Sequence, residues 1–483
     1  MSNLEWVPNR SSQLPLHQQI YAYMKRKIMN GEWTIGTKIP PQRTLALQFN
    51  VNRSTIVTVL DELVADGLIQ AKVGRGTVVM NNTWSIISST PPPDWRNYVK
   101  SGTYQPNQSI IQDINNAESR PDIIRLGTGE LAPELLPSEK MKKVFLQNKK
   151  HPLSLSYTEP KGDLYLREQI CNFLKTKGIA VTPASILIVS GGLQALQLIS
   201  LGLLHKGSTI FHETPSYLTS INLFQSAGMN LFGIPMENEG MKIDLLGQLK
   251  RQHNGALLYT IPSFHNPTGV SISKTRRKQL LDVCSKERLP IIEDDVYGDL
   301  WFEQPEPKPL KATDQQGLVL YMGSMSKTLG PGLRIGWLVG PEPAIDRLSD
   351  IKMQTDYGSS TLSQYAVAEW LASGLYEEHL HHIRKELKIR RDLTLQILEK
   401  YFSEIATWNI PKGGFYIWLK LNMDVSMNKL FKKGLKEGIL INPGNIYDQN
   451  DSTHLRLSFS YATAEQLEQG LIKLADLIEK RND

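Results

Sequence analysis

The chain has few cysteines and no long apolar run, and each absence excludes a class of protein. Two of the 483 residues are cysteine, Cys171 and Cys284, and they lie far apart in the sequence. This spacing argues against a disulfide framework and a cysteine-based zinc site, and it fits a reducing cytosol. No run of about 18 apolar residues is present, and the polar N-terminus does not have the pattern of a signal peptide. We therefore expect a cytoplasmic protein without membrane spans.

The composition otherwise describes a globular protein of two or three domains. Hydrophobic residues make up 40% of the chain and charged residues 21%, and the ten histidines lack metal-ligand spacing such as that of an HExxH motif, so no metal is expected. The net charge of +6 is uneven, because residues 1–80 hold nine Lys or Arg against five Asp or Glu. A small basic module of this kind suits contact with a phosphate backbone.

Residues 14–80 have the pattern of three helices followed by a hairpin. The first helix is expected over 14–29, where apolar residues recur at four-residue spacing, the second over about 42–49, and the third from Arg53. Two strand-like segments then flank the turn Gly74–Gly76. This order of helices and wing is the pattern of a winged helix-turn-helix domain, which we place over residues 12–80.

The composition changes between residues 81 and 120, a range that we interpret as an interdomain linker. It contains three consecutive prolines, at 91–93, which resist both helix and sheet. Beyond it, short apolar runs such as Ile186–Val189 and Ala256–Tyr259 alternate with amphipathic helices. This alternation predicts an α/β domain over residues 121–483, with a mostly parallel sheet covered by helices on both faces.

The motifs of the N-terminal module resemble those of the GntR family of bacterial regulators. The segments that carry the resemblance are Ile39–Ala46, Val51–Ile56, Gly67–Ile69 and Gly74–Val78, with Pro41 where the family has serine. In such a domain Arg43 would hold a DNA phosphate, and Arg75 in the wing would contact phosphate or the minor groove. The residues that would face the major groove begin the third helix: Arg53, Ser54 and Thr55. An alternative is a protein-interaction module with solvated arginines.

The segment Gly323–Arg334 places one lysine among groups that bind phosphate. Lys327 has Ser324 and Ser326 before it and Arg334 seven residues after it. A lysine amine forms an imine with an aldehyde, while hydroxyls and a guanidinium hold phosphate oxygens. These are the groups that pyridoxal 5'-phosphate requires.

Further motifs resemble fold-type I aminotransferases in their order along the chain. The resemblance implies phosphate binding by the backbone amides of Gly192 and Leu193 at a helix N-terminus. It also implies roles for side chains around the cofactor: Tyr217 stacked on the ring, Asn266 and Tyr297 on the ring hydroxyl, Asp294 on the ring nitrogen, Tyr157 on the neighbouring subunit's phosphate, and Arg456 on the α-carboxylate of an amino acid.

The two halves together resemble the MocR subfamily of bacterial transcriptional regulators. The resemblance implies a homodimer, head to tail, that binds double-stranded operator DNA and pyridoxal phosphate and senses an amine or amino-acid effector. Effector binding would then shift domain closure and the distance between the two DNA-binding domains. Two alternatives stay open: a catalytically active aminotransferase with an appended DNA-binding module, and a regulator that senses pyridoxal phosphate itself.

Overall fold

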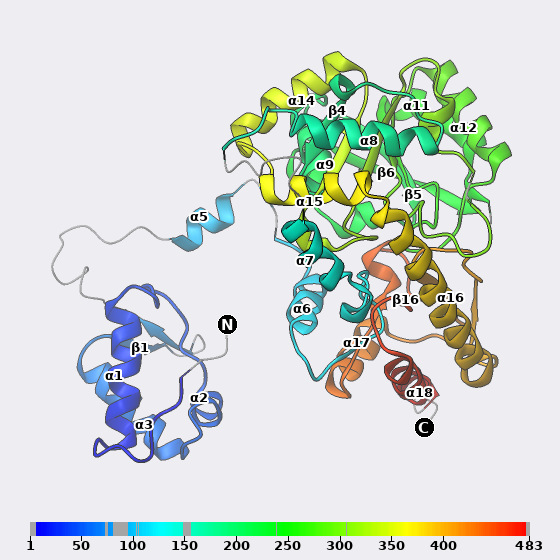
Figure 1. Cartoon of the computed structure of the whole chain (residues 1–483). Helices are drawn as coiled ribbons and strands as arrows, with labels where there is room; N and C mark the ends of the chain where they lie inside the picture. The colour runs from blue at the N-terminus through cyan, green and yellow to red at the C-terminus, as the bar shows by residue number, and fades with distance from the viewer. Residues whose placement is uncertain are drawn as a thin grey trace. The chain divides into compact units, whose positions relative to one another are not determined.

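The computed structural model divides the chain into two compact units, Met1–Gly102 and Thr103–Asp483 (Figure 1). It describes residues 6–72, 76–80, 95–102, 104, 106–147, 156–237, 239–305 and 307–479. The proposed wing residue Arg75 and the three prolines of the linker lie outside the described residues.

The first unit contains the three helices and the hairpin that the sequence predicts. The elements are α1 (Leu16–Met29), α2 (Gln42–Gln48), α3 (Arg53–Ala65), β1 (Ile69–Lys72) and β2 (Gly76–Val79), followed by α5 (Trp95–Ser101). β1 and β2 pair antiparallel. The N-terminal helix-turn-helix fold is therefore confirmed.

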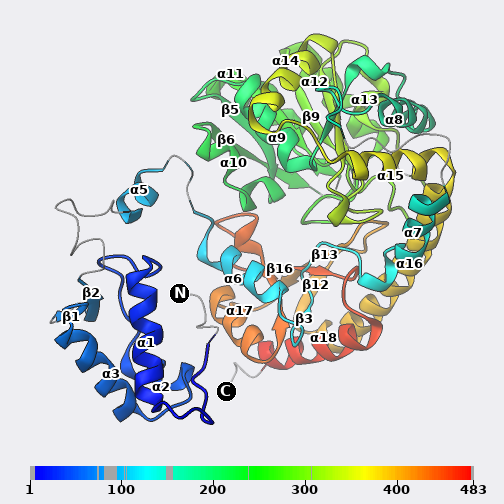
Figure 2. The ribbon, with the colours of Figure 1, turned by 60° about the vertical axis from the view of Figure 1, so that its left-hand side comes forward.

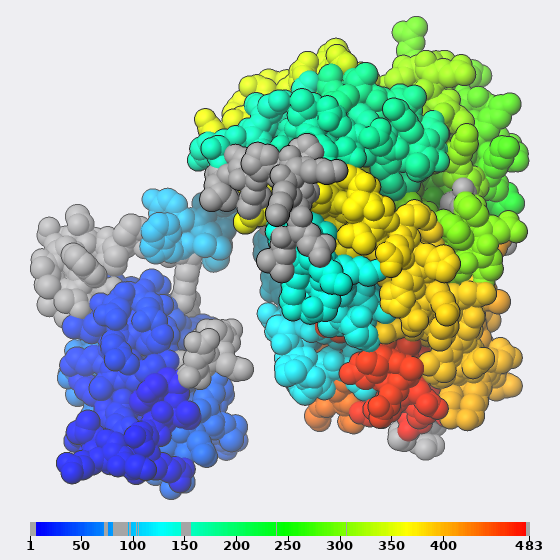
Figure 3. Space-filling view, viewed as in Figure 1, coloured from blue at the N-terminus to red at the C-terminus, as the bar shows by residue number. Residues whose placement is uncertain are grey.

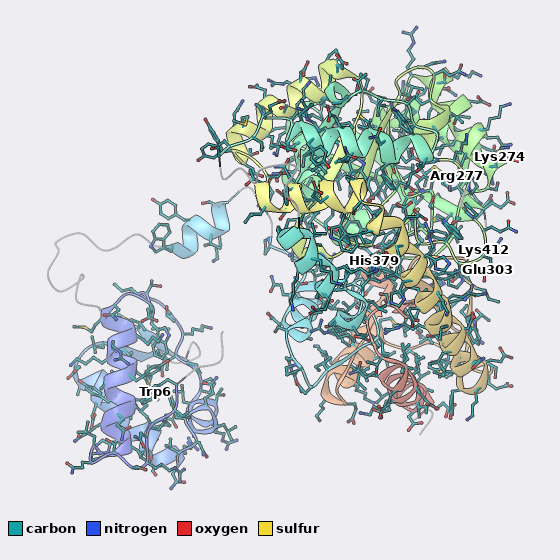
Figure 4. All side chains as sticks on the ribbon, in the orientation of Figure 1. Trp6, Lys274, Arg277, Glu303, His379 and Lys412 are labelled. Carbon is teal, nitrogen blue, oxygen red and sulfur yellow. The ribbon has the colours of Figure 1, made fainter. Side chains whose placement is uncertain are left out.

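The core of the first unit forms where α1 and α3 bury their apolar stripes together. Ile20 and Ile28 of α1, and Ile56 and Leu63 of α3, are fully buried. The segment before α1 joins this core through Trp6, whose ring stacks on Tyr23 with centroids 4.6 Å apart (Figure 4). Burial of these side chains supplies most of the stability of so small a unit.

The second unit is built on an eight-stranded sheet of order β4-β11-β10-β9-β8-β5-β6-β7. The strands are β4 (Ile186–Val189), β5 (Thr209–Thr214), β6 (Asn230–Glu237), β7 (Gly240–Met241), β8 (Gly255–Thr260), β9 (Ile291–Asp294), β10 (Val319–Ser324) and β11 (Gly336–Val339). The pairs from β10 to β6 are parallel, whereas β11 and β7 run antiparallel to their neighbours. Every residue of β4, β9, β10 and β11 is buried, so both faces of the sheet are covered.

Helices surround this sheet, as the predicted α/β class requires (Figures 1 and 2). They are α7 (Ser138–Gln147), α8 (Leu164–Thr176), α9 (Gly192–Gly202), α10 (Leu223–Ser226), α11 (Ile243–His253), α12 (Lys274–Glu287), α13 (Leu310–Thr313), α14 (Glu342–Thr355), α15 (Thr361–Ala372) and α16 (Leu375–Phe402). Figure 3 shows α7, α8, α15 and α16 at the surface of one face. The mostly parallel, helix-covered sheet is confirmed.

A smaller second sheet, which the sequence did not predict, lies in the C-terminal part of this unit. It has the order β12-β13-β16-β15, with β12 (Ala406–Trp408), β13 (Tyr416–Leu421), β15 (Asn442–Pro443) and β16 (His454–Ser458). β14 (Ile439–Leu440) pairs in parallel with β3 (Ile124–Arg125). The helices α17 (Met427–Lys436) and α18 (Ala464–Glu479) complete this part.

Helix α6 (Ser109–Glu118) belongs to the second unit although it lies in the range that we interpret as a linker. Its residues Ile114 and Ala117 are buried in the core of that unit, and Ile110 and Ile111 pack against it. This apolar stripe recurs at helical spacing and explains why α6 docks. None of the helices in the described part of the chain is long and apolar enough to cross a membrane.

Replacement of Leu63 by alanine should destabilise the first unit by about 2–5 kcal/mol, because it removes a fully buried side chain and leaves a cavity. The matched control is Leu47→Ala, since Leu47 is 82% exposed and its loss should change stability by less than about 0.5 kcal/mol. Differential scanning calorimetry of the full chain would follow the transition of the first unit. Equal melting temperatures for the two variants would contradict this core assignment.

Candidate functional site

One cavity of about 340 Å³ brings together eleven of the twelve side chains and amides that the sequence suggests for a cofactor and effector. These are Gly192, Leu193, Tyr217, Asn266, Asp294, Tyr297, Ser324, Ser326, Lys327, Arg334 and Arg456. Asp294 is the last residue of β9 and Ser324 the last residue of β10, and the two strands run parallel. The cavity therefore lies at the carboxyl edge of the sheet, where α/β folds commonly bind ligands.

The twelfth residue, Tyr157, does not line this cavity. Its side chain is 80% exposed, and its ring contacts the edge of Tyr357, with centroids 5.0 Å apart. An exposed position is what contact with a neighbouring subunit requires, so the role suggested for Tyr157 stays a prediction.

One end of the cavity has the groups of a phosphate site. Gly192 and Leu193 begin α9, and amides in the first turn of a helix have no partner within it. Gly191 before them has a φ of 87°, and a Cβ atom there would lie 2.5 Å from Nη2 of Arg334. Arg334 itself donates from Nη2 to the Ser190 carbonyl at 2.6 Å. Glycine at position 191 thus allows the guanidinium to lie directly against the loop.

The two serines at this end are connected to each other. The hydroxyl of Ser324 donates to Oγ of Ser326 at 3.0 Å, and the amide of Ser326 donates back to Oγ of Ser324 at 3.1 Å. Two hydroxyls, a guanidinium and two helix amides form a donor set typical of phosphate binding.

Lys327 lies in the turn after β10, and α16 fixes that turn. Nζ of Lys327 donates to the Gly129 carbonyl at 2.7 Å. Next to it, Nε2 of His379 lies 2.8 Å from the Thr328 carbonyl, and the Tyr376 hydroxyl donates to Oγ1 of Thr328 at 2.9 Å (Figure 4). Burial lowers the pKa of His379 to about 4, so its ring is neutral and Nε2 carries the donated proton.

Asp294 presents an unpaired carboxylate oxygen in the cavity. Its Oδ2 accepts a hydrogen bond of 2.6 Å from the Tyr259 hydroxyl, whereas its Oδ1 is buried without a partner in the described structure. Burial raises the pKa of Asp294 to about 6. A buried acceptor without a donor costs free energy, so this oxygen is suited to a ligand that brings an N–H group.

Arg456 lies at the other end of the cavity, enclosed by aromatic rings. Its guanidinium lies 4.3 Å from the ring centre of Tyr416 and 4.9 Å from that of Tyr447. Nη1 donates to Oδ1 of Asn266 at 2.8 Å and Nη2 to the Gly127 carbonyl at 2.6 Å. The Arg456 residue is only 7% exposed, and its Nε is buried without a hydrogen-bond partner in the described part of the chain.

Asn266 and Tyr297, the two groups suggested for the ring hydroxyl, both line the cavity. In this structure the Asn266 side chain accepts from Arg456, and the Tyr297 hydroxyl lies 2.9 Å from that of Tyr416. The phenol of Tyr416 was not identified from the sequence, because a tyrosine inside a strand is typical of packing.

Two carboxylates in the cavity wall were also missed by the sequence interpretation. Glu118 ends α6, and Glu130 follows the segment Gly127–Gly129 that contacts Arg456 and Lys327. Neither belongs to a local motif, so only the docking of α6 on the second unit brings Glu118 to the cavity.

A buried pair of ionisable groups lies beside the site in sequence. Oε2 of Glu213 and Nε2 of His265 are 3.7 Å apart, and the Thr260 hydroxyl donates to Oε1 of Glu213. Burial raises the pKa of Glu213 to about 7 and lowers that of His265 to about 3. His265 directly precedes Asn266, and Glu213 lies four residues before Tyr217, so the pair is adjacent in sequence to two residues that line the cavity.

A larger cleft of about 760 Å³ lies on the other side of the end of β9. Several of its charged groups already have partners: Lys177 lies 3.1 Å from Asp295 and 3.0 Å from Asp299, and Arg384 stacks 4.1 Å above the Trp301 ring. The smaller cavity instead offers unpaired Asp294 and Arg456 atoms. We therefore assign the functional site to the smaller cavity, despite its size.

The residues suggested for DNA contact lie at the surface of the first unit. Arg43, Arg53 and Ser54 are exposed, and Thr55 is half-buried. Nε of Arg53 donates to Oε1 of Gln42 at 3.1 Å, which links the beginnings of α3 and α2. The start of α3 is thus accessible for a major groove, as helix-turn-helix geometry requires.

Comparison with known proteins gives matches to both units. The model for bacterial regulatory proteins of the gntR family matches residues 16–79, and that for aminotransferase class I and II matches residues 121–474. The chain is 55% identical to the HTH-type transcriptional regulator YisV of Bacillus subtilis, over 99% of this chain and 98% of that protein. It is 37% identical to the HTH-type transcriptional regulator NorG of Staphylococcus aureus, over 92% of this chain and 100% of that protein.

Among solved structures, the second unit is similar to a kynurenine aminotransferase of Pyrococcus horikoshii, described as a complex with PMP. The TM-score is 0.76 and the identity 30%, over 81% of this chain and 99% of that chain. A multiple substrate aminotransferase of Thermococcus profundus has a TM-score of 0.75 at 29% identity, over 81% of this chain and 99% of that chain.

Replacement of Glu213 by glutamine should stabilise the protein more at pH 8 than at pH 5. The folded-state pKa of about 7 exceeds the unfolded value, so the folded state binds more protons and the free energy of unfolding falls as pH rises from about 4.5 to about 7. The variant lacks this loss and should gain about 2–3 kcal/mol relative to the parent across that range. Calorimetric melting at both pH values would measure the difference in free energy of unfolding between the variant and the parent, with the exposed change Glu399→Gln as control. The same difference at both pH values would contradict an ionising Glu213.

Proposed function

We propose that this protein senses a small amine through bound pyridoxal phosphate. The chain belongs to the aminotransferase class I and II family and also carries the DNA-binding domain of gntR-type regulators. This combination is the MocR-type architecture. It is a regulator of transcription with an aminotransferase-like domain, as are relatives that match nearly its whole length. The cofactor, the effector and the residues that contact them are the proposed part.

The fit of the cavity to pyridoxal phosphate carries this proposal. The unpartnered Oδ1 of Asp294 matches a protonated ring nitrogen, and Ser324, Ser326 and Arg334 match the phosphate together with the amides that begin α9. Lys327 lines the same cavity and provides the amine. When bound, pyridoxal phosphate supplies an aldehyde that condenses with amines and a ring that withdraws electrons.

The protein's own side chains have separate tasks in this scheme. Lys327 provides the attachment point and, when its amine is released, a base. Asp294 keeps the ring nitrogen protonated, Tyr217 covers a ring face, and Asn266 and Tyr297 hold the ring hydroxyl. Arg456 takes a carboxylate of the effector, which its unpartnered Nε and the bidentate geometry of a guanidinium favour.

The contacts of Arg456 and Lys327 suggest how binding reaches the rest of the chain. Both cations hold the segment Leu126–Glu130, through the carbonyls of Gly127 and Gly129. A carboxylate on Arg456 would compete with Gly127 and change how this segment is held. The segment follows α6, the helix that comes after the linker, so the change would shift the populations of two arrangements of the linker.

On DNA, the start of α3 would contact bases and phosphates through Arg53, Ser54 and Thr55. Arg43 would hold a further phosphate. Arg75 of the wing is proposed as a further contact, and it lies outside the described residues. One such domain reads a short sequence, so a head-to-tail homodimer on two half-sites is proposed, with Tyr157 reaching the neighbouring subunit. A regulator of this kind works in the cytoplasm, where bacterial DNA lies.

A catalytically active aminotransferase is a second candidate, because Lys327, Asp294 and Arg456 provide every group that transamination needs. Incubation of the loaded protein with an amino acid and a keto acid separates the candidates: turnover at ordinary enzymatic rates of about 1–10³ per second favours the enzyme. DNA affinity that responds to pyridoxal phosphate alone would instead identify the cofactor itself as the signal.

Lys327→Ala should abolish retention of pyridoxal phosphate after borohydride reduction, because the amine that holds the aldehyde is gone. Intact-protein mass spectrometry would measure the retained cofactor, with exposed Lys400→Ala as a control that keeps it. The Lys327→Ala protein should also bind operator DNA without any response to added amines. Full cofactor retention, or an unchanged response, would refute the proposed sensing site.

Arg53→Ala should weaken binding to the DNA upstream of the protein's own gene by about 1–3 kcal/mol if Arg53 reads a base. If Arg53 holds a phosphate, the slope of the logarithm of the binding constant against the logarithm of the salt concentration (the salt slope) should instead fall in magnitude by about one. Arg43→Ala should reduce the salt slope by about one on any DNA sequence. Fluorescence anisotropy at several salt concentrations distinguishes these effects, and Lys400→Ala serves as the control. Wild-type affinity and slope in both arginine variants would exclude this face of α2 and α3.

A further inference from the structure

We propose that the effector carries a second positive group, bound by Glu118, besides the carboxylate that Arg456 takes. The ligand class is then the dibasic amino acids, of which ornithine and lysine are the simplest examples. This inference rests on the proposed function, because it names the class of molecule that the same cavity recognises.

Glu118 is held in position to bind a cation. Its side chain is half-buried in the cavity wall, and its Oε1 accepts a hydrogen bond of 2.8 Å from the buried hydroxyl of Thr128. Within the described residues, no Lys, Arg or His lies within ion-pair distance of this carboxylate. A fixed, partly desolvated carboxylate that forms no ion pair with a described residue favours a ligand that provides a cation at that distance.

Its position at the end of a helix adds to this preference. Glu118 is the last residue of α6, and a helix C-terminus carries a partial negative charge. A second carboxylate, Glu130, lines the same cavity and likewise forms no ion pair with a described residue. Glu118 and Glu130 thus add two carboxylates to the part of the cavity wall that α6 and the segment Leu126–Glu130 form.

Arg456 lines the same cavity, and its unpartnered nitrogen points to a ligand independently. It is about nine-tenths buried, and its Nε has no hydrogen-bond partner in the described structure. Burial alone would lower the pKa of Arg456, but Tyr447, Tyr416, Tyr297 and Glu118 together raise it above its ordinary value. Glu118 is therefore close enough to act electrostatically on Arg456, within the reach of one small ligand.

These charges select among amino acids by their side chains. A carboxylate on Arg456 and an α-amine at the position of Lys327 direct the side chain of an amino acid along the cavity wall. A side-chain ammonium would pair with Glu118, whereas a side-chain carboxylate would meet two like charges, and an apolar side chain would leave Glu118 unpaired. We therefore expect lysine and ornithine to bind best, norleucine less well, and glutamate least.

Binding of the ammonium to Glu118 would also act on the helix that follows the linker. Glu118 and Thr128 are the hydrogen-bonded link between α6 and the segment Leu126–Glu130. Arg456 and Lys327 hold the same segment. A dibasic ligand would therefore contact both ends of this connection, which a simple amine cannot do.

The test is isothermal titration calorimetry of the full-length protein loaded with pyridoxal phosphate. L-lysine should bind at least tenfold tighter than L-norleucine, which has the same chain without the terminal ammonium, and L-glutamate should bind more weakly still. In Glu118→Gln the affinity for lysine relative to norleucine should fall by tenfold or more, because the neutral amide neither pairs with the ammonium nor is left as an unpaired charge by norleucine. Glu118→Lys should reverse the order, so that glutamate binds more tightly than lysine.

The control is Glu399→Gln, an exposed change in the same unit that should keep the order of the parent. Cofactor content and melting temperature establish that each variant is folded and loaded. Equal affinity for lysine and norleucine in the parent, or an unchanged ratio in Glu118→Gln, overturns the inference and leaves the proposed function intact. A loaded protein that binds none of the three amino acids also overturns the inference alone, whereas a protein that takes up no cofactor removes both the inference and the proposed function.

Discussion

Parallel pairing of β8, β9 and β10 is the constraint on which the functional site depends. Strands that run in the same direction end at the same edge of the sheet, so the residues that follow them are brought together although they are far apart in the chain. Asp294 ends β9, Asn266 follows β8, and Lys327 follows β10. The helix amides after β4 join the same edge, because β4 runs in the same direction across β11.

The short segment Leu126–Glu130 connects the carboxyl edge of the sheet to β16 and to α6. It receives hydrogen bonds from Arg456 on β16 and from Lys327 after β10, and its Thr128 donates to Glu118 at the end of α6. Three parts of the second unit thus meet at five residues. A binding event at the cavity has a direct physical route to α6, which lies near the end of the 81–120 range that joins the two units in sequence. This arrangement is consistent with a regulator in which the aminotransferase-like domain acts as a sensor.

Charge pairing distinguishes the site cavity from the larger cleft of about 760 Å³ in the second unit. In the larger cleft, Lys177 is already paired with Asp295 and Asp299. In the smaller one, atoms of Asp294 and Arg456 are buried without partners. Buried polar groups are normally satisfied, so two unsatisfied ones in the residues that line one cavity indicate a ligand that completes them. Asp294 lines the smaller cavity and the adjacent Asp295 lines the larger cleft, because the side chains of successive residues at the end of a strand point to opposite faces of the sheet.

The local patterns of the sequence were sufficient for the helix-turn-helix unit, the helix-covered parallel sheet and the motif residues around Lys327. Each of these depends on short-range periodicity or on a turn with fixed residue types, such as the glycines before α9. The sequence could not show that α6 packs on the second unit, that Glu118 and Glu130 line the cavity, or that Tyr416 lies against Tyr297 and Arg456. Those positions depend on tertiary contacts, such as that between Tyr297 and Tyr416, 119 residues apart, and a single glutamate or tyrosine carries no local sign of its partner. The sequence alone therefore determined the elements and the chemistry near the lysine, and the tertiary structure decided which charges face a ligand there, because only packing sets the distance between them.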